Sequence, residues 1–155
     1  MKKLTKVLAL VLVLATLAFT LVSCSTYGNV KKAFEKEGYT ESEDVEKLAK
    51  DYKEKAEKDN LAVQLHVFTK GAEKLTDILN VDAVLVYEFN ASDDLKKAME
   101  EKESIKGLVN DILKDENVND AYNTLVEMGY VNGNCLVISL NPLNVNKVRD
   151  IVKKA

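Results

Sequence analysis

Histidine, cysteine and tryptophan are scarce in this chain of 155 residues, which has one, two and none of them respectively. The sequence has no Cys-x-x-Cys, no His-Glu-x-x-His, no glycine-rich phosphate-binding loop and no Gly-x-Ser-x-Gly turn. We therefore predict no metal and no cofactor. These absences argue against the common metalloenzymes, nucleotide-binding enzymes and serine hydrolases.

Acidic residues are missing from the first 23 positions, which hold Lys2, Lys3 and Lys6 followed by an apolar stretch over 7–22. A short basic segment followed by an apolar one is the pattern of a secretory signal peptide. The sequence therefore predicts that residues 1–23 form an export signal.

The apolar stretch ends in Leu21-Val22-Ser23-Cys24, which resembles the lipobox of bacterial lipoproteins. The resemblance implies cleavage between Ser23 and Cys24, a diacylglyceryl group on the Cys24 thiol, and a lipid anchor on the extracytoplasmic face of the cell membrane. Two alternatives stay open: a retained transmembrane anchor, for which roughly 20 apolar residues are usual, or an ordinary small-residue cleavage site. All three place the remaining chain beyond the cytoplasmic membrane.

The 132 residues after Ser23 are acidic, because they hold 19 basic and 25 acidic side chains and so carry a net charge of −6. Nucleic-acid binding needs a basic surface, and an anionic bilayer repels an acidic domain, so the net charge disfavours both as partners. If Cys24 is acylated, Cys135 has no partner for a disulfide. It lies in an apolar run and is predicted to be a buried thiol rather than a reactive or metal-binding one.

Residues 24–29 are small and polar and are predicted to be a short tether, with residues 30–155 forming one α+β domain. The order α-α-β-β-α-α-α-β-α predicts an antiparallel sheet of about three long strands with helices packed on one face. We expect helices from 30 to Gly38, over 43–58, from Ser92, from Ser104, from Asn117 to Gly129 and from Pro142 to about Lys153, and strands over 61–69, 82–89 and 135–140.

Local signals refine this outline. Thr40-Glu41-Ser42-Glu43 matches a capping box, and Asn132-Gly133 matches a type I′ hairpin turn. Gly107 is predicted to break or kink the helices around it. Residues 70–80 are compatible with either a helix or a loop.

The alternation in strand 61–69 directs its leucines and valines toward the helices and leaves Gln64 and His66 on an open face. We predict these two residues as a contact surface, and a general-base or ligand role for His66 is the alternative. Glu88 lies between Tyr87 and Phe89 and is predicted to point to solvent, opposite its neighbours. A catalytic carboxylate is the alternative for Glu88.

Residues 115–120 begin like a calcium-binding loop, with Asp115, Asn117 and Asn119 at alternate positions. The glycine required at the sixth position is Asp120, and the glutamate required at the twelfth is Val126. We therefore favour a helix-to-helix turn over a calcium site.

The whole layout resembles small uncharacterised lipoproteins of low-GC bacteria, which combine a lysine-rich signal, a lipobox and one α+β domain with a late segment such as Gly133-Asn134-Cys135-Leu136-Val137. This resemblance implies a fold and a location and no activity. Our first hypothesis is a non-catalytic module, anchored to the membrane through Cys24, that binds an envelope protein or ligand. A cell-envelope hydrolase whose site is assembled from distant residues, and a small-ligand receptor for a transporter, are the alternatives.

Overall fold

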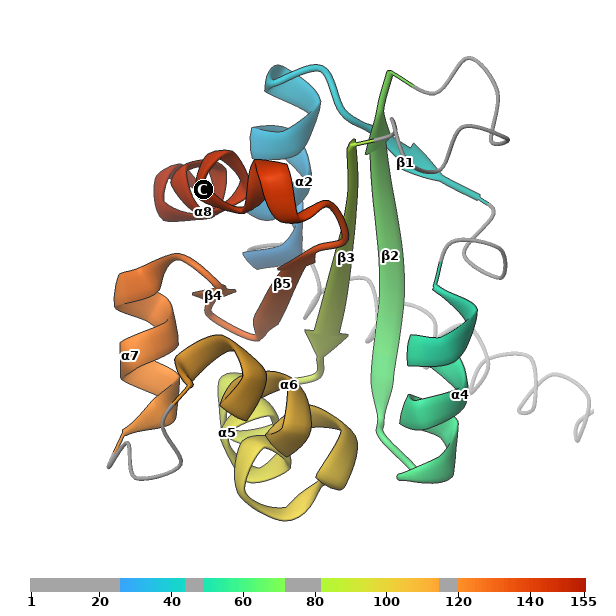
Figure 1. The fold of residues 1–155 in the computed structure, drawn as a ribbon, viewed down its shortest axis with the longest axis vertical. Helices are drawn as coiled ribbons and strands as arrows, with labels where there is room; N and C mark the ends of the chain where they lie inside the picture. The colour runs from blue at the N-terminus through green and yellow to red at the C-terminus, as the bar shows by residue number, and fades with distance from the viewer. Residues whose placement is uncertain (1–25, 44–48, 72–81, 115–119) are drawn as a thin grey trace, which may run out of the picture.

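The structure, a computed structural model, describes residues 26–43, 49–71, 82–114 and 120–155. Its centre is an antiparallel sheet of five strands in the order β1-β2-β3-β5-β4 (Figure 1). The strands are β1 (Thr40–Ser42), β2 (Val63–Lys70), β3 (Asp82–Phe89), β4 (Val131–Asn132) and β5 (Cys135–Ser139). The helices are α2 (Thr26–Lys36), α4 (Lys50–Lys58), α5 (Ser92–Glu101), α6 (Glu103–Leu113), α7 (Ala121–Met128) and α8 (Val145–Lys154), and a 3-10 turn (Pro142–Asn144) precedes α8.

One face of the sheet is covered by α4, α5, α6 and α7. Alternate strand residues point to this face, so Leu85 of β3 and Leu136 of β5 share one hydrophobic cluster. Leu95 of α5, Ile105 of α6 and Leu125 of α7 complete the cluster, and all five side chains are fully buried. This cluster is the larger part of the core.

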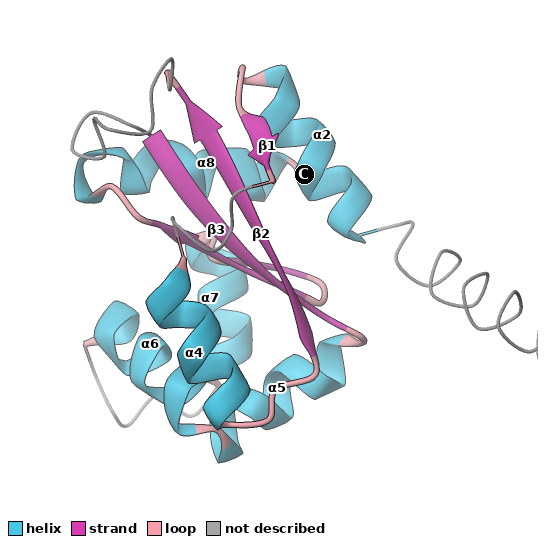
Figure 2. Cartoon of the chain, turned by 90° about the vertical axis from the view of Figure 1, so that its right-hand side faces the viewer, coloured by secondary structure: helices cyan, strands magenta, loops and turns pink. Residues whose placement is uncertain are grey.

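The opposite face is covered by α2 and α8, which contact each other (Figure 2). Here Phe68 of β2, Val86 of β3 and Val137 of β5 form a second buried cluster with Phe34 of α2 and Ile151 of α8. The domain therefore has three layers, with helices on both sides of one sheet.

The prediction of an α+β domain built on an antiparallel sheet is confirmed, but the prediction that helices cover one face is wrong. The physical reason lies in the central strands, since β3 is buried along almost its whole length and β5 is buried from Cys135 to Ile138. A sheet that is half open to water would have polar residues at every second position of these strands. The sheet also has five strands instead of three, because the short strands β1 and β4 extend its edges.

Strand β1 forms where the sequence predicts a capping box, so that prediction is wrong. Its residues Thr40–Ser42 pair with residues 67–69 of β2, which supplies hydrogen-bond partners that a short polar segment cannot find alone. Of the helix expected over 43–58, the structure describes α4 from Lys50, and residues 44–48 lie outside the described residues.

Strands β4 and β5 form the expected hairpin around a different turn. Asn132 pairs with Cys135, so the two turn residues are Gly133 and Asn134. Gly133 has a φ of +54°, whereas Asn134 is not among the residues with positive φ. A type I′ turn needs positive φ at both central residues, so the predicted type is wrong, and the pattern fits a type II′ turn.

Helix α2 begins at Thr26, inside the segment 24–29 expected to be a tether. Gly107 lies within α6, and the break that was expected there falls instead at Lys102, between α5 and α6. The extended backbone of Lys102 separates the two helices.

Two predictions concern segments outside the described residues. These are the calcium-like pattern and Asn117 cap within 115–119, and most of the ambiguous stretch 70–80, of which the structure describes Lys70 and Gly71. Asp120, where description resumes, caps α7 by accepting a hydrogen bond from the Asn123 amide at 3.0 Å. Within the described ranges, no helix is both long enough and apolar enough to cross a membrane.

Candidate functional site

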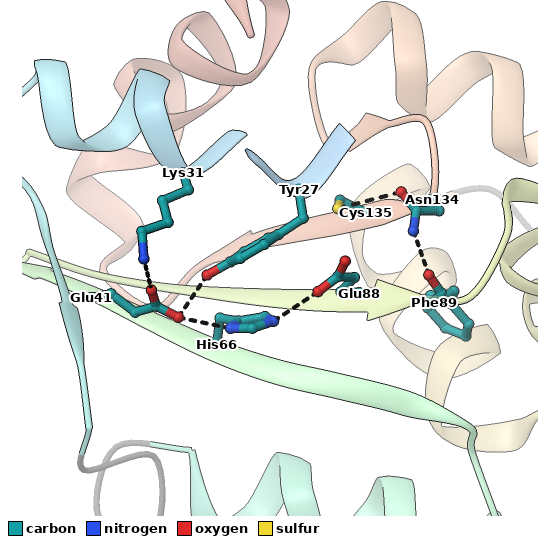
Figure 3. Close-up of polar contacts among 8 residues, drawn as sticks. All are labelled: Tyr27, Lys31, Glu41, His66, Glu88, Phe89, Asn134 and Cys135. Atoms are coloured by element: carbon teal, nitrogen blue, oxygen red, sulfur yellow. Dashed lines mark hydrogen bonds and ion pairs between the residues drawn. The ribbon is translucent and has the colours of Figure 1, made fainter. Parts of the chain in front are cut away.

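The only histidine of the chain, His66 in β2, lies between two carboxylates (Figure 3). Its Nδ1 is 2.8 Å from Oε1 of Glu41, and its Nε2 is 3.0 Å from Oε2 of Glu88. A neutral imidazole donates from one nitrogen only. Two simultaneous hydrogen bonds to carboxyl groups therefore require either a protonated ring or a proton on one of the carboxyls.

Helix α2 covers this arrangement with two side chains. The Tyr27 ring stacks on the imidazole of His66 at a centroid distance of 3.9 Å, and its hydroxyl donates to Oε1 of Glu41 at 2.6 Å. One turn later, Lys31 donates from Nζ to Oε2 of Glu41 at 2.6 Å. We call Tyr27, Lys31, Glu41, His66 and Glu88 the histidine network.

The strand register brings the three strand residues of the histidine network to one face. Glu41 of β1 lies opposite Phe68, and Glu88 of β3 lies opposite Gln64, which places each one diagonal to His66 across a strand pair. Side chains diagonal across neighbouring strands are within reach of each other when they are long. Because this face is the one that α2 and α8 cover, all three polar side chains lie beneath a helix.

Burial increases along the histidine network from the surface inward. The exposed fraction of the side chain is 39% for Lys31, 29% for Glu41, 15% for His66 and 6% for Glu88. A buried polar group that lacks a partner is costly. The chain of hydrogen bonds from Lys31 to Glu88 therefore allows a carboxylate to lie inside a largely apolar layer.

The electrostatic balance is clearest at Glu41. Partial burial alone raises the pKa of its carboxyl, but hydrogen bonds from Lys31, Tyr27 and His66 outweigh burial and lower the pKa to about 2. The partners respond in the opposite sense, since the hydrogen bond to Glu41 raises the pKa of Lys31, and burial followed by the same carboxylate raises the pKa of Tyr27. Glu41 is therefore an ionised acceptor of three hydrogen bonds.

Cys135 lies beside the inner end of the histidine network and is fully buried in β5. Burial, with a further contribution from the nearby Glu88, raises the pKa of its thiol to about 12. The reactive form of cysteine is the thiolate, so Cys135 stays protonated and unreactive at neutral pH. The structure thus agrees with the expectation of a free, buried thiol.

The histidine network is closed on itself rather than poised for a reaction. Both ring nitrogens of His66 are used inside the fold, and a face of the ring is covered by Tyr27. Among the residues that the structure describes, no group of three or more histidine, cysteine or acidic side chains could hold a metal ion. What the arrangement does physically is join α2 to β1, β2 and β3.

The structure corrects two sequence predictions at this site. Gln64 is exposed as expected, but His66 lies under α2, so the two residues do not form an open contact surface. Glu88 does not point to solvent, because the face opposite Tyr87 and Phe89 is covered as well. Tyr27, Lys31 and Glu41 were missed, although Tyr27 stands seven residues before the buried Phe34, which is a helical spacing.

Compared with protein-family models, with curated proteins and with solved structures, the chain shows no match. The class that the fold defines is a three-layer α+β domain with a buried polar network under its first described helix.

The lowered pKa of Glu41 predicts a loss of stability in acid. Its pKa is about 2 in the folded protein against an ordinary value of 4.5, so its contribution is complete above pH 4.5 and disappears as the pH falls toward 2. With allowance for solvent at a partly exposed carboxyl, we expect this contribution to be on the order of 2 kcal/mol. The measurement is urea unfolding of wild type and Glu41→Gln between pH 7 and pH 3.

We expect the free-energy difference between these two proteins to shrink steadily below pH 4.5. Glu127→Gln, at an exposed position on α7, serves as the control because it removes a carboxylate that lies outside the histidine network. A difference between wild type and Glu41→Gln that stays constant down to pH 3 contradicts the prediction.

Proposed function

We propose that the protein is a lipoprotein of the bacterial cell envelope, anchored through Cys24, whose domain is a non-catalytic binding or interaction module. The basic and apolar signal pattern over 1–22 and the Leu21–Cys24 motif support the anchor. In the sequence, the proposed lipid site Cys24 lies two positions before Thr26, the first residue of α2.

The observation that carries the non-catalytic part is the engagement of His66. A histidine general base needs a ring nitrogen within reach of the substrate, and both nitrogens here bond to carboxyl groups of the same domain. The nearby thiol of Cys135 is held in its unreactive form by burial. We therefore favour a binding role over the cell-envelope hydrolase.

Mass spectrometry of the mature protein, isolated from membranes of the cells that make it, tests the anchor. We expect a chain that begins at Cys24 and carries a diacylglyceryl group, and a Cys24→Ser variant that lacks this mass. A chain that still begins at Met1 would indicate a retained transmembrane segment. A chain that is cut but unmodified would indicate ordinary export, and either result overturns the lipoprotein proposal.

A further inference from the structure

The charges of the domain are divided between its two helical layers. Helices α2 and α8 on one face carry seven basic and two acidic side chains, whereas α4, α5, α6 and α7 on the other face carry seven basic and ten acidic ones. Although the net charge of the chain is acidic, the layer formed by α2 and α8 is therefore basic. We call the outward faces of α2 and α8 the basic face.

Four lysines dominate the basic face, namely Lys32 and Lys36 of α2 and Lys153 and Lys154 of α8. All four are exposed, and none of them forms an ion pair within the described part of the chain. They point away from the sheet, because the opposite sides of these helices hold the buried residues of the second cluster, such as Phe34. The two helices contact each other and lie on the same side of the sheet (Figures 1 and 2).

The remaining basic side chains of this layer have partners. Lys31 binds Glu41 at 2.6 Å, Lys147 lies 3.8 Å from a carboxylate oxygen of Asp82, and Arg149 donates to the backbone oxygen of Met128 at 2.5 Å. These contacts hold the layer together. The four exposed lysines lie outside such contacts, and with the two exposed acidic residues of the same helices they leave a positive net charge for an external anion.

We propose that the basic face lies against the anionic lipid headgroups of the membrane that carries the Cys24 anchor. This inference rests on the proposed lipid anchor. Cys24 precedes Thr26, the first residue of α2, by two positions, which is a reach of at most about 7 Å. The lipid therefore holds α2 at the bilayer surface, where a lysine gains about 1 kcal/mol from anionic headgroups, or about fivefold in binding.

Charge also determines which helical layer faces away from the bilayer. The layer of α4 to α7 has more acidic than basic side chains and would be repelled by the same bilayer. The two acyl chains of a diacylglyceryl group hold the protein at the membrane, and the basic face adds an orientation that the lipid alone does not set. The domain is thereby oriented, with α4 to α7 turned toward the envelope and free to meet another molecule.

Surface labelling of the mature lipoprotein tests this orientation. The protein is added to preformed vesicles of phosphatidylcholine alone or of phosphatidylcholine with phosphatidylglycerol, and a water-soluble amine reagent then modifies its lysines. We expect Lys36 and Lys153 to react about fivefold more slowly on the anionic vesicles, and this protection to disappear in high salt. Lys97 and Lys106 on the other layer should react equally on both.

Paired variants provide the matched control. Lys153→Gln with Lys154→Gln should reduce protection of the basic face, and Lys55→Gln with Lys58→Gln, which removes the same charge from α4, should leave it unchanged. Mass spectrometry of Cys24 accompanies each preparation. Lipidated protein that labels equally on both vesicles overturns the basic-face inference and leaves the anchor in place, whereas protein without lipid overturns the proposed function on which the inference rests.

Discussion

Replacing His66 by alanine should destabilise the domain by about 3 kcal/mol. The substitution removes two hydrogen bonds to carboxyl groups, at 2.8 Å to Glu41 and 3.0 Å to Glu88, together with the stacking contact of Tyr27. Removing one partner of a buried hydrogen bond costs more than the bond itself contributes, because the carboxyl groups that bonded to it stay in a poorly hydrated site. Urea unfolding at pH 6 of wild type and variant measures the difference.

Gln64→Ala is the matched control for this experiment. Gln64 lies two residues earlier on the same strand and the same face, but its side chain is exposed. Exposed substitutions of this kind usually change stability by about 0.5 kcal/mol or less. If His66→Ala and Gln64→Ala lowered the free energy of unfolding equally, the histidine network would contribute nothing to stability. His66 would then behave as an open surface residue.

The strands with dense apolar patterns could be predicted from the sequence. Strand β3 has the predicted bounds of 82–89, and β5 lies within the predicted 135–140, because β-branched and aromatic residues in short runs have few alternatives. Short edge strands gave no such signal. Residues 40–42 are a strand only because β2 pairs with them, and this pairing is a property of the folded chain.

The histidine network could not be predicted from the sequence either, because its contacts also form only in the folded chain. Gln64 and His66 are polar at alternate positions, which is the pattern of a strand with one wet face. His66 is buried nonetheless because Glu41 and Glu88, 25 and 22 positions away in the chain, bond to its two nitrogens. The alternation of polar and apolar residues along a strand shows which side chains are polar. It does not show which distant residue forms a hydrogen bond with them.

The net charge of the chain also gave no indication of how charge is distributed over the surface. A value of −6 for residues 24–155 predicts repulsion from an anionic bilayer, yet helices α2 and α8 together carry seven basic and only two acidic side chains. The separation depends on which helices share a face of the sheet. A sheet with helices on one face only would place the basic helices α2 and α8 in the same layer as the acidic ones, and no separate basic surface would be predicted.

The second large effect is expected at Gly129, which ends α7. Its φ is +84°, and a Cβ built there would lie 2.6 Å from the backbone oxygen of Arg149 in α8. Gly129→Ala therefore combines a left-handed backbone, which costs about 1–2 kcal/mol for an L residue, with a clash against backbone that cannot rotate away. We expect a loss of about 3 kcal/mol or more in thermal or urea unfolding.

Two other glycines separate these contributions. Gly71 also has a positive φ, +81°, but nothing lies within 4 Å of the position its Cβ would take, so Gly71→Ala should cost only the backbone strain. Gly107 lies inside α6 in open space with ordinary φ, so Gly107→Ala should stabilise by about 1 kcal/mol, since alanine favours a helix over glycine. The expected order of stability is Gly107→Ala above wild type, then Gly71→Ala, then Gly129→Ala. If Gly129→Ala proved no worse than Gly71→Ala, the close approach of the end of α7 to Arg149 of α8 would be wrong.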